Sequence, residues 1–365
     1  LNGKLNSIEW GEYSIGELFD SSNGDFDIQK QHINNKGEYV ITAGVTNNGI
    51  LGKTDVKAKI FDEKTITVDM FGFAFYRPFK YKMVTHARVF SLKPRFNMAE
   101  NQGLFIASSM YFLNKKFGYE NMCSYEKIKA DRIKLPIKEG KLDFDFMESF
   151  IAELEAERIA ELSAYLTVSG FDNYKLSENE KQVLDEFKNG KVTFNNFTYA
   201  NIFNNIKQGK RLKKDDQIAG DIPFVMSGTT NNGVVNYVSN SVALFPANAI
   251  TIDIFGNVFY RNYAFGAGDD TGVYWNSEVK YSKETMLFFT TSMANSIKGK
   301  YSYGKKLRSS QSLNFKMQIP SKNGQPDYKF METLISAIEK LVIKDVVLYT
   351  DKKLTTAKSV VQDNI

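Results

Sequence analysis

Cysteine, histidine and proline are all scarce in this chain of 365 residues, and long hydrophobic runs are absent. The single cysteine, Cys123, excludes a disulfide within the chain and suits a reducing compartment, so we expect a cytoplasmic protein. One cysteine and two histidines, His32 and His86, exclude an ordinary zinc site. No run of 18 apolar residues predicts a membrane span. The many aromatic residues, 29 Phe and 19 Tyr, predict buried cores and a folded chain.

Signatures of catalysis are missing as well. We find no GxxxxGK[ST] loop, no GxGxxG after a strand and no Asn-Pro-Pro-Tyr-type loop of an adenine methyltransferase. The segment "PDYK" at 326–329 resembles part of a nuclease motif, but its downstream partner is only "DKK" at 351–353, and Asp327 is better explained as a helix cap. We therefore predict no catalytic residue, no metal site and no cofactor in this chain. The net charge of +5 permits an anionic partner without requiring one.

Repetition is what the sequence has in abundance. The segment "ITAGVTNNGILG" at 41–52 returns as "VMSGTTNNGVVN" at 225–236, 184 positions later. The same offset relates three further pairs, which are 66–77 "ITVDMFGFAFYR" with 250–261 "ITIDIFGNVFYR", 116–119 "KFGY" with 300–303 "KYSY", and 135–151 with 319–335. Separate blocks in one register indicate a tandem duplication, and each copy is long enough to be a domain with its own core.

Each copy changes character along its length. Short runs rich in Thr, Val, Ile, Phe and Tyr, broken by Gly, predict strands and hairpins, with a helix at 102–117 in copy one. Two longer stretches, 143–166 and 327–349, lack Gly and Pro and carry apolar residues at helical spacing. Asp143 and Asp327 stand where N-caps belong. A further helix is predicted at 177–189, ending at Gly190, without a counterpart before copy one.

The predicted fold class is α+β, with two tandem mixed β/α domains joined by long helices. Either each long helix packs only on its own domain, or the two pair as an antiparallel coiled coil about a pseudo-twofold axis, which we favour. About 25 helical residues span roughly 37 Å, close to the ~34–36 Å repeat of B-DNA. The helices would then set the distance between two DNA-contacting domains. The predicted division is a first domain at 1–142, a central helical region at 143–189, a second domain at 190–326 and a C-terminal helical region at 327–365.

The two copies share polar and basic side chains next to aromatic ones. The Thr-Asn-Asn-Gly segment offers amides for base edges or phosphates, although it is also ordinary turn chemistry. Arg77 and Arg261 can clamp a phosphate or brace the fold. Asp69 and Asp253 recur without a second carboxylate, so we interpret them as bracing turns. The predicted DNA-binding residues are Thr46, Asn47, Asn48, Arg77, Lys80, Lys82, Arg88, Lys116, Tyr119, Lys210, Arg211, Thr230, Asn231, Asn232, Arg261, Lys300, Tyr303, Lys305, Lys306 and Arg308.

The copies also diverge in one informative segment, where "PFKYKMVTHAR" at 78–88 stands opposite "NYAFGAGDDTG" at 262–272. If both copies hold the DNA backbone alike but recognise different bases, contacts to phosphate should repeat and contacts to bases should differ.

With these repeats, the chain resembles the specificity (S) subunit of type I restriction–modification systems and similar recognition subunits of some type IIB systems. The likeness rests on the doubled "TNNG" loop, the doubled "FYR" strand and the two long helices, and it covers nearly the whole chain. It implies two target recognition domains, each contacting one half of a split double-stranded DNA target. It also implies methyltransferase (M) subunits, two of them, and restriction (R) subunits as partners, which alone would use S-adenosylmethionine, Mg and ATP. The alternatives are a self-contained DNA nuclease or methyltransferase and a duplicated β-rich glycan-binding module.

Overall fold

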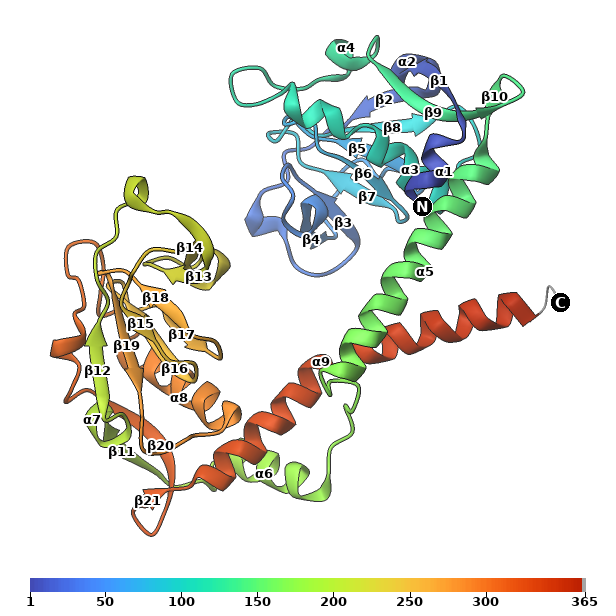
Figure 1. The fold of residues 1–365 in the computed structure, drawn as a ribbon. Helices are drawn as coiled ribbons and strands as arrows, with labels where there is room; N and C mark the ends of the chain where they lie inside the picture. The colour runs from blue at the N-terminus through green and yellow to red at the C-terminus, as the bar shows by residue number, and fades with distance from the viewer. Residues whose placement is uncertain (363–365) are drawn as a thin grey trace. The chain divides into compact units, whose positions relative to one another are not determined.

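The computed structural model describes residues 1–362, which divide into two compact units. Unit 1 comprises residues 1–164 together with the chain from 352 onward, and unit 2 comprises residues 165–351. Figure 1 shows that each unit combines small sheets with a helix laid against them. Among residues 1–362, no helix combines the length and the apolar character needed to cross a membrane.

Unit 1 contains three small sheets. The first has the order β2-β8-β5-β6, with bounds Phe19–Asn23, Phe90–Pro94, Thr65–Val68 and Ala74–Arg77. The second has the order β4-β3-β7, with bounds Ile50–Thr54, Glu38–Ile41 and Tyr81–Met83. The third has the order β1-β9-β10, with bounds Glu9–Ser14, Arg132–Lys138 and Lys141–Leu142. Helix α3 (Glu100–Ser109) packs on β6 and β9.

Unit 2 repeats this arrangement. Its sheets have the order β12-β19-β16-β17 (Asn205–Gln208, Thr271–Trp275, Ala249–Asp253, Val258–Arg261), the order β14-β13-β18-β15 (Val234–Val238, Ala219–Val225, Phe265–Ala267, Leu244–Phe245) and the order β11-β20-β21 (Phe194–Thr198, Lys316–Lys322, Gln325–Pro326). Helix α8 (Lys283–Ile297) takes the place of α3. The predicted duplication and the mixed α+β class are confirmed.

Short helices connect these strands. The α-helical ones are α1 (Asn2–Asn6), α2 (Ile15–Leu18), α4 (Tyr125–Ile128) and α7 (Tyr199–Ile202), and the 3₁₀ ones are η1 (Lys30–His32), η2 (Thr46–Gly49), η3 (Tyr111–Lys115), η4 (Lys214–Asp216), η5 (Thr230–Gly233) and η6 (Ser309–Gln311). The helix predicted at 102–117 is therefore α3 followed by η3. The backbone of Leu113, in η3, lies close against the turn at Gly72, where a Cβ would be 2.6 Å from it.

The two long helices begin inside the cores of the units. Helix α5 runs Phe144–Val168 and helix α9 runs Tyr328–Gln362. Asp143 accepts a hydrogen bond from the Phe146 N–H and Asp327 from the Phe330 N–H, both at 2.9 Å, which confirms both predicted caps. Met147 and Met331, one turn in, are fully buried in the respective cores. Helix α9 continues past the predicted end at 349 because no Gly or Pro interrupts it.

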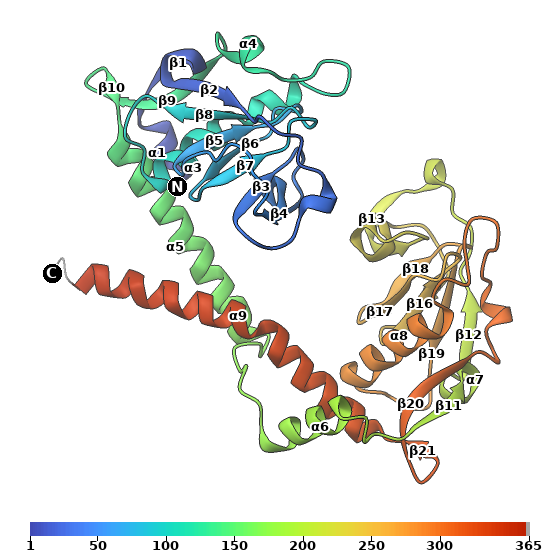
Figure 2. The ribbon, with the colours of Figure 1, turned by 180° about the vertical axis from the view of Figure 1, so that it is seen from behind.

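Helix α6 (Glu178–Lys188) lies along the first half of α9, as Figure 2 shows from behind. Val183 and Leu184 pack against Leu334 and Ala337 of α9. Glu180 accepts hydrogen bonds from the Ser336 hydroxyl and the Lys340 ammonium, both at 2.8 Å. Burial alone would raise the pKa of Glu180, but the hydrogen bonds from Lys340, Ser177 and Ser336 outweigh it and lower the pKa to about 2.

A short helix also precedes the first copy, contrary to the sequence prediction. Helix α1 stands at the positions that correspond, by the offset of 184, to the end of α6. Its Lys4 forms an ion pair with Glu153 of α5, and Leu5 packs against the core of unit 1. The prediction missed it because five residues are too few to show a helical period.

Candidate nucleic-acid interface

The loops that follow β3, β5 and β7 collect at one edge of unit 1. Strands β3 and β7 are parallel, so their carboxyl ends lie together. The Gly44 N–H, after β3, donates to Asp69, after β5, at 2.7 Å. The Cys123 N–H donates to the Met70 carbonyl at 2.8 Å, so the loop that precedes Cys123 lies at the same edge. We call residues 42–49, 69–73, 84–89 and 116–123 the loop edge of unit 1.

Unit 2 forms the same edge from equivalent loops. Strands β13 and β18 are parallel, and the Gly228 N–H donates to Asp253 at 3.0 Å. The Leu307 N–H donates to the Ile254 carbonyl at 2.9 Å, and the Lys210 N–H to the Ala267 carbonyl at 2.9 Å. The loop edge of unit 2 therefore comprises residues 209–213, 226–233, 253–257, 268–271 and 300–308.

The Thr-Asn-Asn-Gly loops have almost the same conformation in both units. Asn47 and Asn48 have φ of 49° and 51°, and Asn231 and Asn232 have φ of 48° and 52°. Two successive left-handed residues cost roughly 1 kcal/mol or more each, least for Asn and Gly. The Thr and both Asn residues are exposed in each loop, while the Gly is buried. The turn interpretation thus explains why Asn is present, and the exposed side chains remain accessible to a ligand.

Two buried aspartates hold these loops in place. Asp69 accepts from the N–H groups of Phe71 (2.9 Å) and Phe73 (3.0 Å) with one oxygen and from Gly44 with the other. Asp253 does the same with Phe255 (2.8 Å), Asn257 (2.9 Å) and Gly228. Each carboxylate thereby ties the β-turn after its strand to the Thr-Asn-Asn-Gly loop. The prediction that both aspartates brace turns is confirmed.

Arg77 and Arg261 do not face solvent, which corrects the prediction that they contact DNA. Each is 2% exposed, with its Nε donating to Thr67 (2.9 Å) or Thr251 (3.1 Å) of the neighbouring strand. Burial lowers the pKa of both guanidinium groups, that of Arg77 to about 10. A buried guanidinium cannot reach a phosphate, so the bracing alternative holds.

The two arginines differ in what they hold. Arg261 donates from Nη2 to the carbonyl of Asn232 at 2.6 Å, so it supports the left-handed loop from behind. The equivalent Nη2 of Arg77 has no hydrogen-bond partner among the described residues. The Arg77 Nη2 atom nevertheless lies close to Gly49, the counterpart of Gly233 in unit 2, because a Cβ built on Gly49 would be 3.5 Å from this nitrogen.

Two predicted lysines also lie elsewhere. Lys82 is 5% exposed, and its ammonium donates to the carbonyls of Thr54 (3.2 Å) and Val56 (2.5 Å), so it links backbone segments and does not contact a ligand. Strand β7 is buried on both faces, which the alternating pattern of "KYKM" did not reveal. Lys80 is exposed but precedes β7, at the end of the strand opposite to the loop edge.

The remaining predicted residues do gather, exposed, at the loop edges. In unit 1 they are Thr46, Asn47, Asn48, Arg88, Lys116 and Tyr119, and in unit 2 they are Lys210, Arg211, Thr230, Asn231, Asn232, Lys300, Tyr303, Lys305, Lys306 and Arg308. Some are partly engaged, since Lys116 pairs with Asp131 at 2.7 Å and Lys306 lies 5.0 Å from the Tyr303 ring. Cations beside exposed aromatic rings suit a polyanion with stacked bases.

Sequence reasoning missed two residues that shape these edges. Asp27 accepts from the Thr85 hydroxyl at 3.2 Å and from His86, and so anchors the loop after β7. Asp270 accepts from the Ser227 N–H at 2.9 Å beside the second Thr-Asn-Asn-Gly loop. Neither recurs in the other copy, so the repeat gave no signal for them. Residues 1–362 contain no group of three or more His, Cys, Asp or Glu side chains that could hold a metal ion.

Comparison with known proteins gives three findings. The family model described as "Type I restriction modification DNA specificity domain" matches residues 7–164 and 191–348, again 184 positions apart. The specificity subunit S.BcgI of a type II restriction enzyme from Heyndrickxia coagulans is 27% identical over 347 residues, which cover 93% of this chain and 97% of that protein. The crystal structure of a type I restriction–modification S subunit from M. genitalium aligns over 98% of this chain and 95% of that one, with a TM-score of 0.56 and 15% identity, which shows a shared fold.

Proposed function

Because the chain belongs to the family of type I restriction modification DNA specificity domains, we infer that it is a DNA sequence-specificity subunit of a restriction–modification system. It is a recognition subunit and not itself a catalyst. The nuclease, methyltransferase and glycan-binding alternatives have no support from the family or from the relatives.

The observation that carries the recognition mechanism is the doubled loop edge. Each unit presents the same braced Thr-Asn-Asn-Gly loop with basic and aromatic neighbours, while the loops after β7 and β18 differ. Features common to both units suit the DNA backbone, which is chemically uniform, and features that differ suit bases. Each unit would therefore contact one half of a split target, which implies two half-sites that differ in sequence.

The long helices would set the distance between the two half-sites. We propose that α5 and α9 pair as an antiparallel coiled coil, and Glu155 of α5 does form an ion pair with Lys353 of α9, at 2.5 Å. Helix α5 has 25 residues, which at 1.5 Å per residue is roughly 37 Å, about one turn of B-DNA. The number of base pairs between the half-sites would follow from this length.

The chemistry would come from partner subunits. We propose assembly with two M subunits, which would bind S-adenosylmethionine and turn an adenine out of the duplex to methylate it, and with R subunits that use Mg and ATP. The chain would hold these partners in register on the split target.

The experiment that tests this function compares the purified chain alone and with its M subunits on DNA. With Mg²⁺ and S-adenosylmethionine present, the chain alone is expected to neither cleave nor methylate DNA, and the complex is expected to methylate it. Methylation or cleavage by the chain alone would contradict the recognition role. Methylation by the M subunits at the same sites with and without this chain would also contradict the recognition role.

A further inference from the structure

One difference between the loop edges is that long side chains bridge neighbouring loops in unit 2 and have no counterpart in unit 1. In unit 2, the Gln208 side chain accepts from the Ser309 N–H at 2.9 Å and donates to the Asp269 carbonyl at 3.0 Å. The Arg308 guanidinium donates to that same carbonyl. In unit 1 the positions of Gln208 and Arg308 are taken by Gly24 and Ser124, 184 positions earlier. Two long side chains are thus replaced by a hydrogen and a short hydroxyl.

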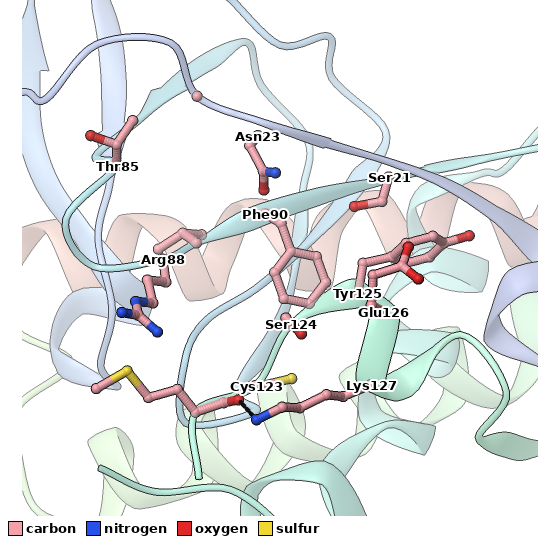
Figure 3. A pocket seen from close by; sticks show the side chains of 13 residues that line it. Ser21, Asn23, Thr85, Arg88, Phe90, Cys123, Ser124, Tyr125, Glu126 and Lys127 are labelled. Atoms are coloured by element: carbon pink, nitrogen blue, oxygen red, sulfur yellow. Dashed lines mark hydrogen bonds between the residues drawn. The ribbon is translucent and has the colours of Figure 1, made fainter. Parts of the chain in front are cut away.

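This replacement leaves a polar hollow in unit 1. Figure 3 shows that its walls come from the end of β2, the loop after β7, the start of β8, and α4 with the segment before it. Phe90 and Tyr125 line it, and Asn23, Thr85, Arg88 and Lys127 supply its polar groups. Only Gly fits at position 24, because a Cβ there would lie 2.9 Å from the Met83 carbonyl oxygen. Glu126 also lines the hollow, but its carboxylate pairs with Lys129 at 2.6 Å.

Arg88 is presented to this hollow by an anchored and strained loop. Its φ of 49° is unfavourable for a long side chain by roughly 1–3 kcal/mol, and such strain gathers at functional sites. Asp27 fixes the loop through Thr85 and His86, and the Arg88 N–H donates to the Thr85 carbonyl at 3.0 Å. Within residues 1–362, no hydrogen bond or ion pair engages the exposed Arg88 guanidinium. Lys127, in contrast, is held by Asn121 and the Met122 carbonyl, both at 2.8 Å.

We propose that Arg88, the exposed cation of this open hollow, recognises a base of one half-site by reaching into the major groove and donating to the O6 and N7 atoms of a guanine. The proposal rests on the DNA-recognition function inferred above. An Arg fork facing guanine in the major groove is the commonest specific protein–DNA contact. A phosphate contact would be expected to recur in unit 2, but position 272, equivalent to Arg88, is Gly, and there Gln208 and Arg308 bridge to the Asp269 carbonyl. Arg88 therefore distinguishes the first half-site from the second.

The test is sequencing of methylated DNA from cells that carry the M subunits with the full-length chain or its Arg88→Ala variant. Arg88→Ala is expected to relax one guanine position of one half-site, with a roughly 5- to 150-fold loss of preference for that base. The other half-site and the spacer should be unchanged. Lys80→Ala is the matched control, because Lys80 is an exposed cation at the opposite end of β7, and it should leave the motif unchanged.

Two results would overturn the proposal. One is an unchanged motif with uniformly weaker methylation in Arg88→Ala, which would make Arg88 a phosphate contact. The second result concerns Ser124→Arg, which places in unit 1 the side chain that Arg308 supplies in unit 2. This variant decides the question if Arg88→Ala loses all methylation. It should alter the same half-site, and an unaltered motif would sink the idea. Failure of the proposed function itself is distinct, since the unsubstituted chain would then direct no methylation.

Discussion

Replacing Arg261 by Ala separates a bracing role from a DNA contact. The substitution removes hydrogen bonds to Thr251 (3.1 Å), Tyr263 (3.2 Å) and the Asn232 carbonyl (2.6 Å) from a residue that is 2% exposed. A hydrogen bond from a charged donor contributes about 1.5–3 kcal/mol, and an acceptor left buried and unpaired costs a further ~1–3 kcal/mol. We therefore expect the loop at 226–233 to open more readily by about 3 kcal/mol.

The assays are hydrogen exchange of the 226–233 segment and the salt dependence of DNA binding by the complex with M subunits. Faster exchange and weaker binding are expected, with an unchanged slope of log K against log salt and an unchanged motif. A guanidinium that touched a phosphate would instead reduce the slope by about 1 when removed. A reduced slope, a changed motif, or exchange as slow as in the unsubstituted chain would refute the bracing role.

Arg77 provides the internal comparison for this prediction. It makes one of the equivalent hydrogen bonds, to Thr67, and its Nη2 is already unpartnered among the described residues. Arg77→Ala should therefore loosen the loop at 42–49 by less than Arg261→Ala loosens 226–233, by roughly 1–3 kcal/mol. Equal effects in the two units would show that these hydrogen bonds do not account for the stability of the loops.

Three further predictions concern the helices and the whole chain. Inserting four residues after Glu157 lengthens α5 by about 6 Å. The spacer between the half-sites should then lengthen by one or two base pairs, with both half-sites unchanged. Methylation at the original spacing would show that the helices do not set the distance between the half-sites. The pKa of Glu180 is lowered to about 2 from its ordinary value of 4.5. The stability that Glu180 contributes should therefore be complete above pH 4.5 and be lost as the pH falls toward 2. Hydrogen exchange of α6 should show this pH dependence in the unsubstituted chain and not in Glu180→Gln. With a net charge of only +5, the chain alone should bind DNA weakly and its complex with M subunits tightly, and tight specific binding by the isolated chain at physiological salt would contradict this.

The sequence was most informative where a pattern repeats. The offset of 184 predicted two domains of like topology, and capping residues with apolar periodicity predicted where α5 and α9 begin. These features are local or duplicated, so each can be recognised without knowing which segments meet in space.

Burial at the loop edges could not be predicted in the same way. Arg77, Arg261 and Lys82 are basic residues on short strands, and alternation along a strand indicates a face but not whether a distant loop covers it. The hollow in unit 1 depends on Gly24, Arg88 and Ser124, which are far apart in the sequence and have no like residues in the second copy. Only the folded arrangement shows that they meet.

The most direct test of the central claim is methylome sequencing of cells that carry the M subunits with and without this chain. Methylation is expected only with the chain, at a motif of two unlike half-sites separated by an unspecific spacer of fixed length. A single uninterrupted motif, or the same methylated sites in the absence of the chain, would contradict the claim that each unit recognises one half of a split target.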